Sequence, residues 1–108
     1  DLGVRGIIHA STTAPAAGAT VTLEDRAWDP GVLATATTDA DGRFSMSVVG
    51  LTSVDGCWAT LLDYWIVAEK GTDRGERGVN SELYAAIIDG TLQADLSSFP
   101  IEMEDTAR

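Results

Sequence analysis

The strongest constraint in this sequence is a period of two, in which apolar and polar residues alternate over short stretches separated by Gly, Asp, Asn or Pro. Such a period puts every second side chain on the same face of an extended chain, so each stretch predicts a β-strand with one buried face. The clearest stretches are 19–24 and 43–49. Their expected buried faces are Ala19, Val21 and Leu23 in the first stretch and Phe44, Met46 and Val48 in the second. The chain is therefore expected to be all-β.

The segment Asp39-Ala40-Asp41-Gly42 separates two strand-like stretches and predicts a tight turn. Asp side chains accept hydrogen bonds from turn amides, and Gly42 supplies the positive φ of a type I turn with a following bulge. We therefore expect a β-hairpin here. The same residues resemble the opening of a calcium loop, but the later ligand positions hold Arg43 and Gly50, which favours the turn.

Two segments, 58–69 and 82–88, are apolar on both faces when they are read as strands. The second segment fits either of two structures. It could be a short helix that is capped by Asn80 or Ser81 and ends at Gly90. A strand is favoured, because Asp89-Gly90 is a hairpin signal and clean alternation resumes after it.

Strands that are apolar on both faces need two apolar neighbours, whereas a two-sheet sandwich offers one. The outward side chains would then form an exposed patch suited to self-association. The connection 71–78, rich in charge and glycine, is expected to be a surface loop that adds a polar rim. A long loop of the same chain folding over this face is the alternative. The expected contact residues are Leu61, Trp65, Val67, Leu83 and Ile87, with Arg74 and Arg77 in the rim.

Length and charge limit the classes of function. The 108 residues are expected to form a single domain, 1–108, and 17 acidic against 7 basic residues give a net charge of −10. Such a surface repels phosphates, so nucleic acid is not an expected partner. No stretch approaches the roughly 20 apolar residues of a membrane-spanning helix. One cysteine, Cys57, excludes an internal disulfide framework; it is either a small buried residue or a bridge between subunits.

Several segments together resemble a known family. They are Val4-x-Gly6-x-Ile8, the run from Ala14 to Leu23, the run from Thr37 to Phe44, and Tyr64-x-Ile66-x-Ala68. The combination is similar to the carboxypeptidase regulatory-like, transthyretin-like (prealbumin-like) domains. The resemblance implies a seven- to eight-stranded Greek-key β-sandwich, used as an accessory, adhesive or assembly module of exported proteins. The segment 50–58 and the charged connection after Lys70 depart from the family pattern.

Catalysis is not expected. Transthyretin-like hydrolases use several histidines and a C-terminal Tyr-Arg-Gly-Ser, whereas this chain has only His9 and ends in Glu-Asp-Thr-Ala-Arg. The related dioxygenases need two His and two Tyr on iron, which one histidine does not satisfy. A relay of Ser11, His9 and an Asp is less plausible than a surface histidine at a strand end. We expect no catalytic residues, no metal and no cofactor.

The expected function is that of a non-catalytic structural module, secreted or on a cell surface, that is adhesive or self-assembles, with filaments as one outcome. The expected partner is a second copy, in a homo-oligomer or polymer, and other surface proteins or polysaccharide are further candidates. A carbohydrate-binding accessory module of an exported enzyme is the alternative, because sugars stack on aromatic rings. The candidate rings belong to Trp28, Trp58, Trp65, Tyr64 and Tyr84.

Overall fold

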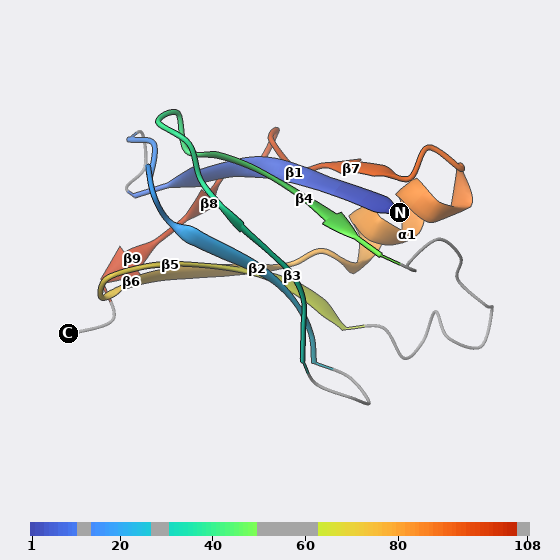
Figure 1. The fold of residues 1–108 in the computed structure, drawn as a ribbon, viewed down its shortest axis with the longest axis horizontal. Helices are drawn as coiled ribbons and strands as arrows, with labels where there is room; N and C mark the ends of the chain where they lie inside the picture. Colours follow the sequence, from blue (N-terminus) through green and yellow to red (C-terminus); the bar gives the residue numbers. More distant parts are fainter. Residues whose placement is uncertain (11–13, 27–30, 50–62, 106–108) are drawn as a thin grey trace.

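The structure is a computed structural model that describes residues 1–10, 14–26, 31–49 and 63–105 (Figure 1). These residues form a two-layer β-sandwich, with one short helix at one end (Figure 1). The expected mostly-β sandwich is confirmed at this level. The elements are β1 (Leu2–His9), β2 (Thr20–Asp25), β3 (Gly31–Thr37), β4 (Arg43–Val48), β5 (Tyr64–Lys70), β6 (Asp73–Gly78), α1 (Asn80–Ile88), β7 (Gln93–Asp95), β8 (Ile101–Glu102) and β9 (Glu104–Asp105).

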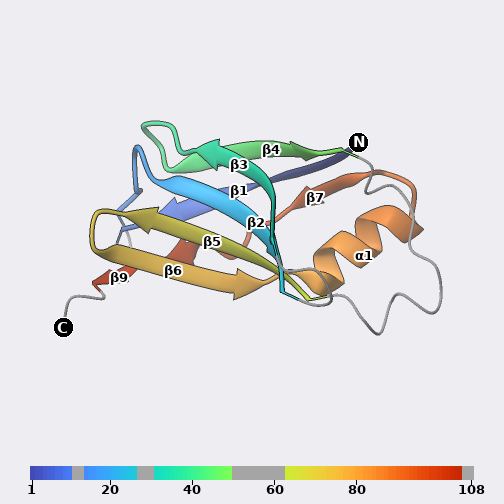
Figure 2. The same cartoon turned by 60° about the horizontal axis from the view of Figure 1, so that its bottom comes forward.

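The strands divide into a five-stranded and a four-stranded sheet (Figure 2). The five-stranded sheet has the order β3-β2-β5-β6-β9, with every pair antiparallel. The four-stranded sheet has the order β4-β1-β7, and β8 also pairs with β1. In this second sheet β1 is antiparallel to β4 and parallel to β7 and β8.

The core fills the space between the two sheets, and the period of two explains which side chains enter it. The expected buried faces of 19–24 and 43–49 are confirmed, because all six apolar side chains are buried. Ile66 and Leu2 are fully buried beside them, as is Leu83 from α1. Burying such side chains contributes about 25 cal/mol per Å² of apolar surface, which makes this layer the main source of stability.

The turn at Asp39–Gly42 forms as expected, but the hairpin does not. Asp39 Oδ1 accepts hydrogen bonds from the N–H groups of Asp41 and Arg43 at 2.9 and 3.0 Å, and Gly42 has a φ of 75°. The strands on either side pair with different partners, β3 with β2 and β4 with β1. Ile8 N–H donates to Gly42 O at 2.7 Å, so the turn docks on the end of β1 and starts the β1–β4 ladder. The turn therefore carries the chain from one sheet to the other.

The strand expected over 82–88 is wrong, because this segment lies in the helix α1. Val79, Leu83 and Ala86 are buried at spacings of four and three, which places them on one helical face. Tyr84 and Ile88 lie on the exposed face. The helix therefore explains why the segment 82–88 carries apolar residues on both faces when it is read as a strand.

The charged connection 71–78 was expected to be a loop, and most of it is the strand β6. β6 pairs with β5 over six residues, from Trp65 opposite Gly78 to Lys70 opposite Asp73. Gly75 has no side chain because a Cβ there would collide with the backbone oxygen of Glu102. Close packing of backbone against backbone thus explains a glycine that sequence alone assigns to a flexible loop.

Candidate functional site

The apolar residues expected to form an exposed patch are buried or partly covered where the structure describes them. Leu61 lies outside the described residues. Leu83 is fully buried in the core, and Val67 is buried between Thr22 of β2 and Glu76 of β6. The expected exposure of Leu83 and Val67 is therefore wrong: Leu83 is on a helix, and neighbouring side chains of the same chain cover Val67.

Ile87 and Trp65 are only partly covered. Ile87 packs against the core from α1. Trp65 points outward from β5, and its Nε1 donates to Asp63 Oδ1 at 2.6 Å. The guanidinium carbon of Arg26 lies 4.6 Å from the centroid of the Trp65 ring, a cation–π geometry. Trp65 thus has a partner in its own chain, and the sequence pattern did not indicate Arg26 in this role.

Arg26 also joins Trp65 to a row of charges on the outer face of the five-stranded sheet. Its guanidinium lies 2.8 Å from Glu76 and 3.1 Å from Glu24. The hydrogen bond from Arg26 lowers the pKa of the Glu76 carboxyl, and the same bond raises the pKa of Arg26. Arg74 reaches Glu76 at 3.2 Å and Glu69 at 3.9 Å. This face therefore satisfies its charges internally.

Arg77, the second expected rim residue, is also bound within its own chain. Its guanidinium forms an ion pair with Glu82 at 2.8 Å and donates to Phe99 O at 3.1 Å. It also lies 5.4 Å from the centroid of the Phe99 ring. These contacts fix α1 and the segment before β8 against β6.

On the outer face of the five-stranded sheet the charged side chains pair with one another, whereas the edge strand β3 has backbone groups that point away from the sheet. Thr38 N–H donates to Ala19 O, whereas Arg26 N–H donates to Asp63 O. Odd-numbered residues of β2 therefore bond to β3 and even-numbered residues to β5, as antiparallel alternation requires. Thr35 and Thr37, which stand opposite even-numbered residues of β2, consequently direct their N–H and C=O groups away from the sheet. β3 ends the strand order, so in the described part of the chain no strand pairs with this edge.

The side chains of β3 leave this edge unprotected. The strand reads Gly-Val-Leu-Ala-Thr-Ala-Thr and has no charged residue. Val32 is 58% and Leu33 41% exposed. A register shift opposite Leu23 and Glu24 is its one irregularity. Proteins usually protect strand edges with charges, proline, short length or bulges. β3 has only the bulge, beside Val32 and Leu33, so its regularly paired part, 34–37, is a candidate pairing edge.

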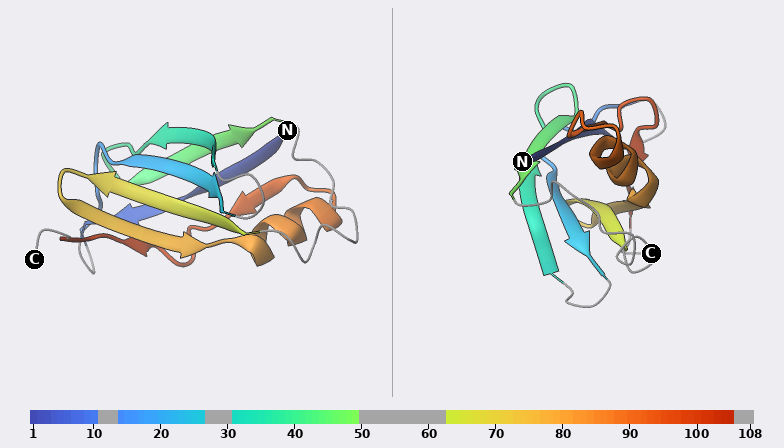
Figure 3. Two further views of the ribbon diagram at one scale, coloured as in Figure 1. Left: turned by 90° about the horizontal axis from the view of Figure 1, so that it is seen from below. Right: turned by 90° about the vertical axis from the view of Figure 1, so that its right-hand side faces the viewer.

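β3 and β4 together form one side of the sandwich, which we call the open side (Figure 3). The opposite side, which we call the closed side, is bridged by the chain itself. β8 pairs with β1 in one sheet and β9 pairs with β6 in the other. Buried Met103 lies between them, and its N–H donates to His9 O at 2.8 Å. The strands β8 and β9 also carry Glu102, Glu104 and Asp105.

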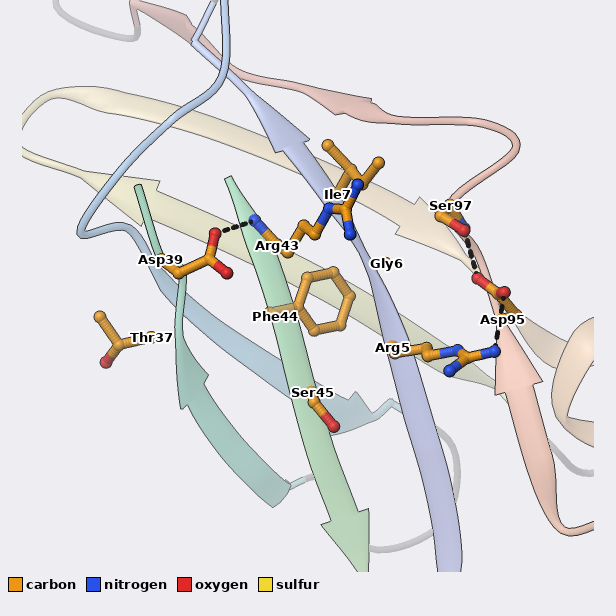
Figure 4. A pocket seen from close by; sticks show the side chains of 10 residues that line it. All are labelled: Arg5, Gly6, Ile7, Thr37, Asp39, Arg43, Phe44, Ser45, Asp95 and Ser97. Carbon is orange, nitrogen blue, oxygen red and sulfur yellow. Dashed lines mark hydrogen bonds and ion pairs between the residues drawn. The ribbon is translucent and has the colours of Figure 1, made fainter. Parts of the chain in front are cut away.

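A groove of about 870 Å³ lies on the outer face of the four-stranded sheet (Figure 4). Arg5 forms an ion pair with Asp95 across it at 3.2 Å. Asp95 Oδ1 accepts hydrogen bonds from the side chain and the backbone N–H of Ser97, and these bonds lower the pKa of Asp95. The lining residues are Arg5, Gly6, Ile7, Thr37, Asp39, Arg43, Phe44, Ser45, Asp95 and Ser97.

The aromatic residues considered for sugar stacking do not form a visible platform. Trp28 and Trp58 lie outside the described residues, and Tyr64 is buried. Trp65 is covered by Arg26, which leaves Tyr84 of α1 as the exposed member in the described part.

Across the described ranges, no three His, Cys, Asp or Glu side chains are grouped so as to hold a metal ion. Nor does any helix in this part have the length and apolar character needed to cross a membrane. His9 is half-buried at the end of β1, and Ser11 and Cys57 lie outside the described residues.

No protein-family model, curated protein or solved structure matches this chain.

Proposed function

We propose that this protein is a non-catalytic contact module, secreted or on a cell surface, that self-associates by pairing its β3 edge with β3 of a second copy. The observation that carries this proposal is the uncharged β3 edge, with which no strand of the described residues pairs, and the exposed Val32 and Leu33 beside it. Strand addition uses main-chain hydrogen bonds for affinity and side chains for specificity.

Antiparallel pairing of two β3 strands satisfies the outward backbone groups of Thr35 and Thr37 in both copies. It also removes Val32 and Leu33 from water, and each such side chain contributes at most about 1.5–3 kcal/mol when fully buried. The contact is isologous, so it closes on itself as a dimer. Growth into a filament needs a second contact, and β4, the other edge of the open side, is the candidate.

Charge governs when this contact forms. Each copy carries −10, so two copies repel at low ionic strength. No charged residue of β3 enters the contact, so screening removes the repulsion without weakening the pairing. Association is therefore expected to increase with salt.

The transthyretin-like, Greek-key type is part of the same proposal. The first four strands are compatible with it, because β4 pairs with β1 in one sheet and β3 pairs with β2 in the other, as in a Greek key divided between two sheets. The sequence resembles transthyretin-like domains, which serve as accessory modules of exported proteins, and this resemblance supports the proposed location.

The test is a pair of matched substitutions. Thr35→Lys puts a charge on the exposed face of the β3 edge, and Thr20→Lys puts the same charge on the same face one strand inward. Both positions are exposed, and both variants have the same net charge. Molar mass is measured by light scattering across a salt series, and thermal unfolding verifies that each variant is folded.

We expect the native protein and Thr20→Lys to rise above the 11.3 kDa monomer mass as salt increases, while Thr35→Lys remains monomeric. A native mass of 11.3 kDa at every salt and protein concentration contradicts the proposal. Equal association of the two variants contradicts the assignment of the contact to β3.

A further inference from the structure

The arginines of the described chain differ in how they are neutralised. Arg5, Arg26, Arg74 and Arg77 each lie within 3.9 Å of a carboxylate oxygen. Arg43 forms no ion pair with any residue in the described ranges. Asp39, four residues before it, accepts hydrogen bonds from the backbone N–H groups of Asp41 and of Arg43 itself. The Arg43 guanidinium instead extends over β1 toward Ile7, as Figure 4 shows.

A second cation lies within reach of the same groove. Arg5 stands opposite Ser45 and Ile7 opposite Arg43, so Arg5 and Arg43 are diagonal neighbours on one face of the β1–β4 pair. Such diagonal neighbours are about 7–8 Å apart at the backbone, a distance that two long side chains span. The ion pair of Arg5 with Asp95 is largely exposed, which leaves Arg5 able to donate to a second anion.

The rest of the lining indicates the chemistry of a ligand. Ser45 and Ser97 supply hydroxyls, and Asp39 and Asp95 supply oxygens that accept hydrogen bonds from a ligand's hydroxyl groups. Two guanidiniums and two carboxylates give the lining no net charge, so a phosphate dianion is disfavoured more than a single carboxylate held by Arg43. The Phe44 ring is buried, so the groove offers no exposed aromatic surface for stacking. The volume of about 870 Å³ is within the range of small-ligand sites.

We infer that this groove binds a small hydroxylated carboxylate of the uronic-acid class, with its carboxylate on Arg43 and its hydroxyls on the Ser and Asp side chains. A guanidinium matches a carboxylate with two parallel hydrogen bonds, which gives this pair both strength and orientation. The groove borders the β3 edge, since Thr37 of β3 is among its lining residues. Binding is therefore tested at low ionic strength, where self-association through β3 is not expected.

The test is calorimetric titration of the full chain at low ionic strength with three probes: a galacturonate trimer, its methyl ester and acetate. The ester removes the charge and keeps the hydroxyls, whereas acetate keeps the charge and lacks the hydroxyls. Arg43→Gln is the test variant. Arg74→Gln, the same change on the opposite outer face, is its matched control. Thermal unfolding verifies that both variants are folded.

We expect saturable binding of the trimer, with affinity at least tenfold weaker for its ester and for acetate. Charge-assisted hydrogen bonds of this kind predict a loss of roughly 10- to 100-fold for Arg43→Gln. Arg74→Gln should bind as the native protein does. Absence of trimer binding, equal binding by Arg43→Gln, or equal affinity for the ester overturns the inference. Equal affinity for acetate overturns the assignment to a hydroxylated ligand.

Discussion

The two sides of the sandwich solve the problem of free strand edges in different ways. On the closed side the chain crosses from β8 to β9, buries Met103 between the sheets and adds acidic residues. On the open side β3 and β4 belong to different sheets and are joined by the Asp39–Gly42 turn, and β3 carries no charge. Charges and strand crossing protect an edge from pairing with another chain. We therefore expect the closed side to contribute mainly to stability and the open side to mediate association.

The largest expected effect is on the closed side. Gly75→Ala places a Cβ 2.3 Å from the backbone oxygen of Glu102, so one of the two backbones must shift. We expect a loss of about 2–3 kcal/mol in the free energy of unfolding, the upper part of the range for overpacking. Gly78→Ala on the same strand is the control, because its Cβ meets the Trp65 ring at 3.7 Å, an ordinary contact. Urea denaturation measures both, and equal stability of the two variants contradicts tight packing on the closed side.

Thr38→Val tests what anchors the open side. The Thr38 hydroxyl accepts a hydrogen bond from Ala19 N–H at 2.8 Å and donates one to Ala16 O, and the side chain is buried. Valine keeps the shape of the side chain but leaves Ala19 N–H and Ala16 O without the hydroxyl. We therefore expect a loss of about 1–3 kcal/mol in the free energy of unfolding. Exposed Thr37→Val should change stability little. Thermal unfolding compares the two, and a Thr38→Val variant as stable as the native protein would show that the turn needs no such anchor.

Trp65→Ala separates the edge contact from the outer face that sequence reasoning favoured. The loss of the cation–π contact with Arg26 and of half-buried ring surface should cost about 1–2 kcal/mol of stability. The increase of mass with salt should remain, because β3 is unchanged. A Trp65→Ala protein that is folded but monomeric would indicate that the contact lies on the outer face of the five-stranded sheet and not at the β3 edge.

The smallest effect is on the acid sensitivity of the outer face. The pKa of Glu76 is lower in the folded chain than in the unfolded chain, where it is about 4.3. The pair with Arg26 therefore stabilises the fold fully above that value, and the contribution is lost as the pH falls through the lower, folded pKa.

Glu76 is partly exposed, so this contribution should be below about 1 kcal/mol. Unfolding measured between about pH 6 and 3 should show a weaker pH dependence for Glu76→Gln than for the native protein. Glu104→Gln removes the same charge from β9 and is the control. Identical pH dependence of native protein and Glu76→Gln would show that the pair contributes nothing.

Local patterns predicted the parts of the fold that local physics decides. Alternation identified the buried faces of β2 and β4, and turn chemistry identified the positive φ of Gly42. Strand pairing was not predicted, because a turn determines where the chain reverses and not which sheet each strand joins. The hairpin expectation failed for this reason.

The candidate site was harder to predict. Leu83 and Val67 read as surplus apolar surface because α1 was interpreted as a strand and the cover over β5 comes from side chains distant in sequence. β6 was missed because charges and glycines hide its alternation. The exposed β3 edge had one usable signal, a seven-residue strand without charge in a strongly acidic chain. The groove had none, because its lining comes from four separate segments.

The most direct test of the β3 contact is hydrogen exchange of single backbone amides as the protein concentration rises at high salt. In the monomer the Thr35 N–H points away from the sheet and should exchange fast, whereas the Ala36 N–H bonds to β2 and should be protected. If the β3 strands of two copies pair, the Thr35 N–H becomes protected in step with the increase in mass, while the Ala36 N–H stays protected throughout. Fast exchange at Thr35 in a sample whose mass shows it to be associated would contradict pairing through β3.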